Sequence, residues 1–156
     1  MEKIINGTRY FFFYRSKLSN WNFSKFVVDG ITYNCGEQYM MHQKALTFGD
    51  LETAKQIMSM VEPSVQKALG RKVTNFNQSV WDNVKYDLIK KGLRERFNQN
   101  PHLKELLLKD KGCVFVEASP VDRIWGIGFN ESEAEENIDK WGENLLGKIL
   151  TDLSNE

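Results

Sequence analysis

The sequence predicts an α+β fold, a helix-rich single domain over residues 1–156 with a small, mostly antiparallel sheet. Three observations support this prediction. Hydrophobic residues make up 41% of the 156 residues, which is enough for a real core. Apolar residues recur at helical spacing through most of the chain, whereas β-prone runs are few and short. The expected strands do not alternate regularly with helices, so a doubly wound parallel sheet is not expected.

Strands are predicted near the N-terminus and once more near residue 115. The run "RYFFFY" (9–14) is short and rich in aromatic residues, as is typical of a buried strand. The run "KFVVDGITYN" (25–34) places Asp29 and Gly30 between two β-prone segments. This pattern predicts a hairpin, because a two-residue turn needs positive φ at both positions. The run "CVFVEA" (113–118) predicts the last strand.

Residues 34–50, "NCGEQYMMHQKALTFGD", are expected to form the first helix. Asn34 is expected to cap it, and Glu37, three residues later, to bond back to the cap in a capping box. Gly49 is placed to end it. The next helix is expected to begin after Asp50, a second capping residue, and to bury one apolar face. That face is expected to consist of Leu51, Ala54, Ile57, Met58 and Val61.

The remaining helices are predicted from their start and stop signals. Pro63 suits the first turn of a third helix, and Asn100-Pro101 opens a fifth. Asn130 and Glu133 form a second predicted capping box. The helices, in order, are expected over about 63–70, 79–98, 101–112, a short stretch after 130, and the C-terminal segment after 144, whose apolar face is Leu145, Leu146, Ile149, Leu150 and Leu153.

Charge and cysteine content exclude several classes of protein. Lys plus Arg and Asp plus Glu each number 21, so the formal net charge is zero, which argues against non-specific binding of nucleic acid. Cys35 and Cys113 are too few for a disulfide framework and share no metal-ligand spacing with His42 or His102. No signal peptide opens the chain, and no run approaches the roughly 20 apolar residues that span a bilayer. A soluble, cytoplasmic protein is expected.

Glu37 and Lys44 are unusual because they share a face of the first helix with apolar neighbours. Seven residues separate them, which places them about 20° apart around the axis and roughly 10 Å along it. Helix capping would explain Glu37, and a snorkelling side chain would explain Lys44. A Lys side chain that leans toward the helix N-terminus would instead approach the carboxylate. The pair could then flank a small ligand.

A second candidate site is the segment "VEASPVDRIWGIG" (116–128), in which a strand leads into a loop. The loop presents Asp122 and Trp125, and Trp125 could stack on a base. Gly126 and Gly128 allow a close approach of backbone to a ligand. The alternative is a loop whose Trp fills the core and whose Asp is solvated. The two glycines lack the rest of a dinucleotide-binding fingerprint, so no Rossmann site is expected.

Two shorter stretches complete the candidate sites. "LSNW" (18–21) is an ordinary Ser/Asn turn by composition, or part of a site. "WGENLLG" (141–147) precedes a helix start near Asn144, where free N–H groups would suit a phosphate. A capped amphipathic helix is the favoured interpretation of the second stretch taken alone.

Together these stretches resemble the NADAR family, also called YbiA-like. The matching segments cover about residues 11 to 150 and combine a Glu and a Lys seven apart with E-A-S-x-x-D-x-x-W-G-x-G. The segment "LKDKG" (108–112) and the C-terminus "KILTDLSNE" depart from the family pattern. The matching segments are "LSNW", "YNCGEQYMMHQKA", "LGRKV", "WDNVKYDLIKKGLRERFNQNP", "LLL", "VEASPVDRIWGIG" and "WGENLLGKIL".

The resemblance implies an N-glycosidase that breaks a C1′–N bond on a phosphorylated ribose. The implied partner is a small molecule: a ribosylamino-pyrimidine phosphate of riboflavin synthesis, or ADP-ribose attached to guanine, including in DNA. The implied catalytic residues are Glu37, Lys44 and Asp122. The implied substrate-binding residues are Asn20, Trp21, Trp81, Trp125, Gly126, Gly128 and Asn144.

A mechanism follows from this class of reaction. A neutral amine is a competent nucleophile, and burial on an apolar stripe would lower the pKa of Lys44 enough to help. Attack by Lys44 at C1′ with ring opening would give a Schiff base, while Glu37 or Asp122 moves protons. Glu37, Lys44, Asp122 and Trp125 are expected to line one pocket, with no cofactor and no metal. The alternative is a module that binds ADP-ribose or NAD without hydrolysis, since fold does not fix function.

Overall fold

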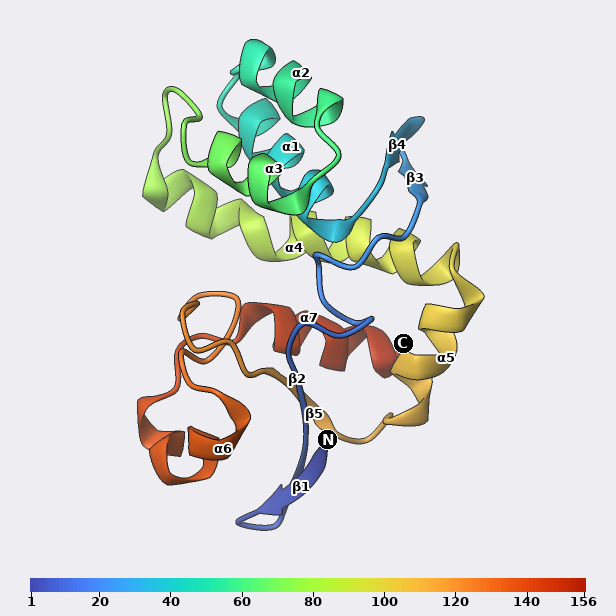
Figure 1. Cartoon of the computed structure of the whole chain (residues 1–156), viewed down its shortest axis with the longest axis vertical. Coiled ribbons are helices and arrows are strands. Elements are labelled where there is room, and N and C mark those ends of the chain that lie inside the picture. Colours follow the sequence, from blue (N-terminus) through green and yellow to red (C-terminus); the bar gives the residue numbers. More distant parts are fainter. The chain divides into compact units, whose positions relative to one another are not determined.

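The computed structural model describes all 156 residues and contains seven α-helices, one short 3₁₀ helix and five strands (Figure 1). The elements, in chain order, are β1 (Glu2–Ile5), β2 (Thr8–Phe13), β3 (Phe26–Val28), β4 (Ile31–Tyr33), α1 (Gly36–Thr47), α2 (Leu51–Ser59), α3 (Pro63–Gly70), α4 (Gln78–Asn98), α5 (Pro101–Lys109), β5 (Val114–Glu117), α6 (Glu131–Ala134), η1 (Glu135–Lys140) and α7 (Leu145–Ser154). The predicted α+β, helix-rich fold class is confirmed.

The chain forms two compact units. The first unit combines residues 1–19 with residues 102–156, and the second consists of residues 20–101. Each is described by itself. The sequence predicts that residues 1–156 form a single domain, and this stays a prediction.

The first unit is built on a three-stranded sheet in the order β1-β2-β5. Strands β1 and β2 pair antiparallel, and their turn has positive φ at Asn6 (51°) and Gly7 (82°). Strand β1 was not predicted, although Asn-Gly between two β-prone runs is itself a hairpin signal. Strands β2 and β5 pair parallel, with Phe11 opposite Phe115, whereas the other strand pairings are antiparallel.

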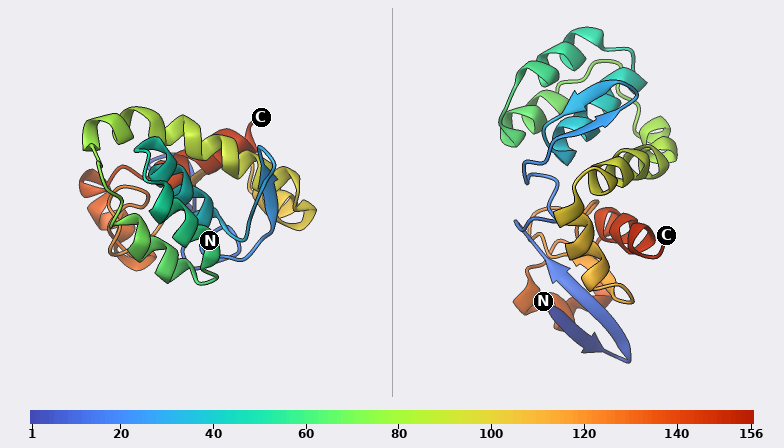
Figure 2. Two further views of the ribbon diagram at one scale, coloured as in Figure 1. Left: turned by 90° about the horizontal axis from the view of Figure 1, so that it is seen from above. Right: turned by 90° about the vertical axis from the view of Figure 1, so that its right-hand side faces the viewer.

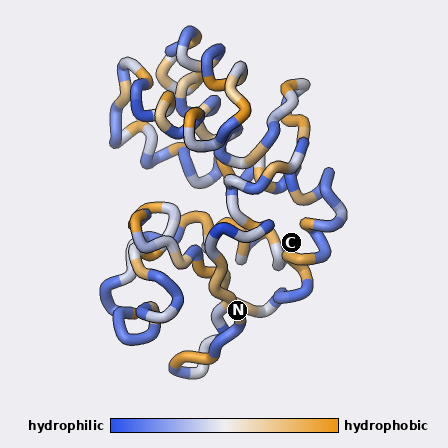
Figure 3. The backbone as a smooth tube through the Cα atoms, viewed as in Figure 1, coloured by the Kyte–Doolittle hydropathy of each residue, from blue (hydrophilic) through white to orange (hydrophobic).

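A hydrophobic core lies on this sheet and is closed by residues that follow β5. In Figure 3 the tube just above the N-terminus is coloured mainly hydrophobic, whereas the hairpin below it also has hydrophilic segments. Trp141 packs edge-on against Tyr10, with ring centroids 5.4 Å apart. Helix α7 packs against β5. The buried members of the core are Ile5, Phe12, Val116, Ala118, Ile127 and Ala134.

The second unit surrounds helix α1 with α2, α3 and α4. Two glycines permit this packing. A Cβ at Gly92 of α4 would lie 2.1 Å from the ring of Tyr39, and one at Gly70 of α3 would lie 1.9 Å from the sulfur of Met41. The hairpin β3–β4 completes the unit (Figure 2), and positive φ at Asp29 (51°) and Gly30 (81°) confirms the predicted two-residue turn.

The predicted helices are confirmed with small changes at their ends. Asp50 caps α2 by accepting a hydrogen bond from the backbone N–H of Thr53 at 3.0 Å. Pro63 occupies the first turn of α3. The expected inward face of α2 was wrong at two positions, because Leu51 is 69% exposed and Val61 is 61% exposed. Leu51 is the first residue of the helix, and Val61 lies beyond its end at Ser59.

None of the helices combines the length and apolar character needed to cross a bilayer.

Candidate active site

The cap of helix α1 differs from the prediction. The N-cap residue is Cys35, which has extended backbone and whose sulfur accepts from the N–H of Gln38 at 3.4 Å. Gln38 in turn accepts a hydrogen bond from the N–H of Asn34 at 2.8 Å. Gln38 thus accepts from the residue before the cap and not from the cap itself, and the prediction of a capping box formed by Asn34 and Glu37 was wrong.

The difference occurs because Asn34 and Gln38 are held by other parts of the unit. The amide of Asn34 donates to the carbonyl of Val61 at 2.9 Å and accepts from Gln66 at 3.2 Å. Gln38 also donates to the carbonyls of Ile57 and Met60, both at 3.3 Å. Helix capping therefore does not explain the carboxylate of Glu37.

Glu37 is only 4% exposed, in the first turn of α1. Its backbone N–H donates to the carbonyl of Asn20 at 3.0 Å. Asn20 is 5% exposed and packs closely on the same turn, since a Cβ at Gly36 would lie 2.5 Å from its side-chain oxygen. The structure thus brings two of the residues singled out by sequence, Asn20 and Glu37, into one place.

Lys44 lies on the same helix, two turns further on, and is half-buried. Burial lowers the pKa of Lys44 below its ordinary value, and the charge of Arg71 lowers it further, while the nearby carboxylate of Glu37 raises it. The ammonium nitrogen lies 4.7 Å from the ring centroid of Phe76. The helix therefore presents a buried carboxylate and an amine that is shifted toward its neutral form.

Phe76 is a residue that sequence reasoning missed. It lies on the connection between α3 and α4 and is 39% exposed. The available signal was a lone aromatic residue between two asparagines, "NFN" (75–77), in an otherwise polar turn. Two further aromatic residues named by the resemblance belong to this unit. Trp81 is 6% exposed in the first turn of α4, whereas Trp21 is 45% exposed, with the ammonium of Lys67 5.9 Å from its ring centroid.

In the first unit, the side chain of Asp122 braces its own loop. One carboxylate oxygen accepts hydrogen bonds from the N–H groups of Ile124 and Trp125, both at 2.9 Å. The N–H of Asp122 donates to the hydroxyl of Ser119 at 3.2 Å. Asp122 and Trp125 are both half-buried. One oxygen of Asp122 thus stabilises the bends of the loop that position Trp125.

The two glycines of this loop are required by contacts within the chain. A Cβ at Gly126 would lie 2.9 Å from the carbonyl oxygen of Glu117. Gly128 has a φ of +80°, and a Cβ there would lie 2.6 Å from the side chain of Arg123. Packing therefore accounts for both glycines, and their predicted role in substrate binding stays a prediction.

The start of helix α7 is occupied by the same loop. The N–H groups of Leu145 and Leu146 donate to the carbonyls of Ile124 and Trp125 at 3.0 and 3.1 Å. These N–H groups are not free for a phosphate, which supports the interpretation as a capped amphipathic helix. Asn144 has left-handed backbone and is 6% exposed. Its amide accepts from the N–H of Glu117 at 3.0 Å and donates to the carbonyl of Phe115 at 2.9 Å, so it braces β5.

Glu37 and Lys44 belong to the second unit, and Asp122 and Trp125 to the first. The pocket common to all four therefore stays a prediction.

No group of three or more His, Cys, Asp or Glu side chains is arranged to hold a metal ion. Burial raises the pKa of the Cys35 thiol to about 11, which makes it a poor nucleophile at neutral pH.

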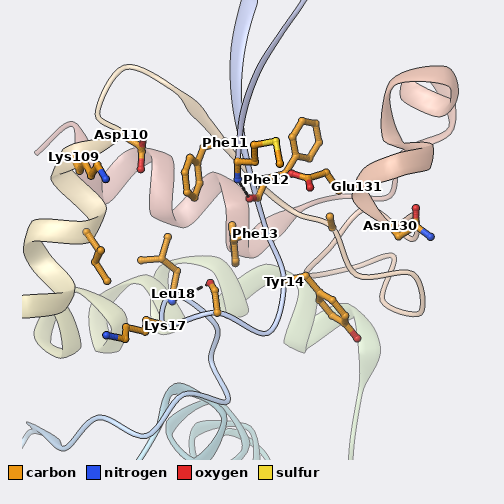
Figure 4. Close-up of a pocket in the computed structure, with 14 residues that line it drawn as sticks. Phe11, Phe12, Phe13, Tyr14, Lys17, Leu18, Lys109, Asp110, Asn130 and Glu131 are labelled. Carbon is orange, nitrogen blue, oxygen red and sulfur yellow. Dashed lines mark hydrogen bonds and ion pairs between the residues drawn. The ribbon is translucent and has the colours of Figure 1, made fainter.

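Two cavities lie away from the predicted residues. A cavity of about 610 Å³ in the first unit runs along the end of β2, with Lys109 and Asp110 at one side and Asn130 and Glu131 at the other (Figure 4). A second, of about 510 Å³, lies in the second unit beside Tyr33. Neither contains a predicted site residue. Because reactivity depends on specific side chains and not on volume, the carboxylate and amine of α1 are the better candidate site.

Comparison with known proteins gives consistent results. The family model of the NADAR domain matches residues 11–156. The chain is 47% identical over 127 residues to N-glycosidase R617 of Acanthamoeba polyphaga mimivirus, covering 80% of this chain and 74% of that protein. It is 42% identical over 76 residues to the Arabidopsis thaliana "Riboflavin biosynthesis protein PYRR, chloroplastic", covering 49% of this chain and 11% of that protein.

The fold is also similar to a solved structure. The NMR structure of the Escherichia coli protein YbiA matches with a TM-score of 0.77 at 28% identity, covering 97% of this chain and 86% of that one. The curated sequence of N-glycosidase YbiA from Escherichia coli K12 is 30% identical over 146 residues, covering 90% of this chain and 84% of that protein.

Proposed function

The chain belongs to the NADAR family and hydrolyses N-glycosyl bonds, and on that premise we propose that it cleaves the C1′–N bond between a phosphorylated ribose and a base. The observation that carries the proposal is the pairing of Glu37 with Lys44 on α1, because Cys35 and Gln38 perform the capping that would otherwise explain the carboxylate. A module that only binds ADP-ribose would need no amine shifted toward its neutral form.

Two substrate classes fit this proposal. One is ADP-ribose attached to guanine, as a nucleotide or within DNA. The other is a ribosylamino-pyrimidine phosphate, and the similarity to a protein named for riboflavin biosynthesis supports including it. The net charge of zero favours a small molecule or a single modified base over extended contacts with a nucleic-acid backbone.

The proposed reaction begins with attack on the sugar. The neutral amine of Lys44 forms a bond to C1′, and the bond between C1′ and the base nitrogen breaks. The base leaves with the bonding electron pair and takes a proton from Glu37 or Asp122, acting as general acid. The other of these two carboxyl groups, in its ionised form, stabilises the developing positive charge on the sugar.

The second half of the reaction regenerates the enzyme. Loss of the ammonium proton from the Lys44 adduct and protonation of the ring oxygen open the sugar to a Schiff base. A water molecule, deprotonated by the carboxylate that gave up its proton, adds to this Schiff base. Its collapse releases the sugar phosphate as an aldehyde and restores the amine of Lys44. Because only a neutral amine attacks, the burial that lowers the pKa of Lys44 supports this role.

The test is to incubate the purified protein with each substrate class and to separate the released base by chromatography. The proposal predicts release of the unmodified guanine nucleotide, or of the aminopyrimidine, at a rate proportional to enzyme concentration. The variant Lys44→Ala serves as the control against a contaminating glycosidase. Absence of base release from both substrate classes, with folded wild-type protein, would contradict the proposal.

A further inference from the structure

Phe76 is an aromatic side chain that contacts the candidate nucleophile in the second unit. Its ring centroid lies 4.7 Å from the ammonium nitrogen of Lys44 and 5.1 Å from the ring centroid of Phe48, which packs against it edge-on. Despite these contacts, Phe76 remains 39% exposed. Part of its ring surface is therefore open beside the candidate nucleophile.

The segment that carries this ring is fixed on both sides. The N–H of Thr74, two residues before, donates to Asp50 at 2.9 Å, and Asp50 also caps α2. Asn75 has a φ of +61°, a left-handed conformation that turns the chain at the residue before the ring. On the other side, Asn77 caps α4 by accepting from the N–H of Val80 at 3.1 Å. The backbone on both sides of the ring is thus anchored within the chain.

An aromatic face attracts two kinds of group, a cation or another flat π system. In the free protein the ammonium of Lys44 lies over the ring. In the proposed reaction the leaving group is a planar heteroaromatic base, bonded through a nitrogen to C1′. A base stacked on the ring would bring C1′ to the neighbourhood of the amine that it displaces.

We infer that Phe76 is the platform on which the leaving base stacks, so that the base replaces the ammonium of Lys44 on the ring and presents C1′ to it. This inference rests on the proposed function and deepens it, because it assigns the base-recognising residue. The subsite selects flat heteroaromatic leaving groups. A bicyclic purine overlaps the ring more than a pyrimidine, so the contribution of Phe76 is larger for guanine.

Other aromatic residues of the same unit suit this role less well. Trp81 is 6% exposed, so little of its ring is open to a ligand. Trp21 is exposed, but the cation near it is Lys67 of α3, at 5.9 Å, and not the amine of α1. Only Phe76 combines an exposed ring with contact to the candidate nucleophile.

The test compares Phe76→Leu with Phe76→Trp in the full chain. Leucine keeps an apolar side chain but removes the π face, whereas tryptophan restores and enlarges it. The matched control is Phe23→Leu, the same substitution at another exposed phenylalanine of this unit, which is 59% exposed. Circular dichroism and thermal unfolding of each variant establish that it is folded. Steady-state release of guanosine from ADP-ribosylated guanosine gives KM and kcat.

Phe76→Leu is expected to raise KM roughly five- to 150-fold. This range is the loss of affinity that corresponds to the stacking of one base on an aromatic ring. Phe76→Trp is expected to keep KM within about threefold of wild type, and Phe23→Leu to leave both constants unchanged. With the ribosylamino-pyrimidine phosphate the rise in KM for Phe76→Leu should be smaller.

An unchanged KM for folded Phe76→Leu, with active wild type, would overturn the inference while leaving the proposed function intact. A KM for Phe76→Trp raised as much as for Phe76→Leu would also overturn it, because shape and not the π face would then matter. Should wild type release no base from either substrate, the proposed function itself fails, and the two failures are thereby distinguished.

Discussion

Helix α1 and the loop over residues 119–128 both carry polar residues that the family resemblance implicates, but the two segments use those residues differently. In the loop, Asp122 accepts two backbone hydrogen bonds, and Gly126 fits against the carbonyl of Glu117. In α1, Cys35 is the N-cap and Gln38 accepts from the N–H of Asn34, so the carboxylate of Glu37 is not the capping partner that the sequence predicts. A polar residue with a complete structural explanation is weak evidence of chemistry, and one whose expected structural role is filled by a neighbour is stronger evidence.

The largest expected effect is at Lys44. We expect Lys44→Ala to lower kcat by at least about 10⁴-fold, as loss of a covalent nucleophile does. Its thermal unfolding should change little, because a half-buried Lys leaves no large core cavity. The matched control is Lys55→Ala at an exposed lysine of α2. If Lys44→Ala turned over substrate at the wild-type rate, Lys44 would not be the nucleophile. Helix α1 would then have no better claim to the chemistry than the loop over residues 119–128.

Variants at Glu37 and Gln38 distinguish a catalytic role from a role in helix capping. Glu37→Gln is expected to lower kcat by about 10²- to 10⁴-fold, the usual effect of losing one acid–base group, while the melting temperature stays near that of wild type. The neighbouring variant Gln38→Ala should do the reverse. It removes three hydrogen bonds and should lower stability by about 1–3 kcal/mol with a small effect on kcat. Equal effects of the two variants on stability would show that Glu37 also supports the helix.

Asp122 tests how far the loop takes part in the reaction. Asp122→Asn retains an oxygen that can accept from Ile124 and Trp125, so the loop should persist. We expect kcat to fall by about 10²-fold if the carboxylate moves a proton. Asp122→Ala should in addition lower the melting temperature, because both hydrogen bonds are lost. Full activity in Asp122→Asn, with a destabilised Asp122→Ala, would identify Asp122 as a brace of the loop only.

The smallest expected effect is electrostatic. The positive charge of Arg71 lowers the pKa of Lys44, so Arg71→Gln should raise that pKa and reduce the neutral fraction at pH 7. The rising limb of kcat/KM against pH should therefore move to higher pH, and kcat/KM at pH 7 should fall a few-fold. Because Arg71 is exposed, the difference should shrink in high salt. A limb that moves to lower pH would contradict the assignment of Lys44 as the titrating group.

Much of the fold could be predicted because its signals are local. The Asp29-Gly30 turn, the Asp50 cap and Pro63 at a helix start act through neighbouring backbone, and all three are confirmed. The cap of α1 was misjudged because the choice between Asn34 and Cys35 depends on a carbonyl far along the chain, at Val61. Local sequence has no information about that contact.

Long-range pairing limited the rest of the prediction. Strands β2 and β5 pair parallel although about 100 residues separate them, and no periodicity reports such a partner. The favoured interpretation of the start of α7 as a capped helix agrees with the structure, but its acceptors, the carbonyls of Ile124 and Trp125, lie on another segment and could not be predicted. Phe76 was overlooked for the same reason, since its importance comes from contact with Lys44, 32 positions earlier. Local patterning identified Glu37 and Lys44 because both lie on one helix.

The most direct test of the central claim is to trap the covalent intermediate. Wild-type protein is mixed with substrate, sodium borohydride is added during turnover, and the digested protein is analysed by mass spectrometry. A Schiff base reduced in this way gives a stable sugar phosphate adduct, and we predict that the adduct is found on the peptide that carries Lys44. Turnover without any adduct on Lys44 would contradict the claim and indicate direct attack by water, activated by Glu37 or Asp122.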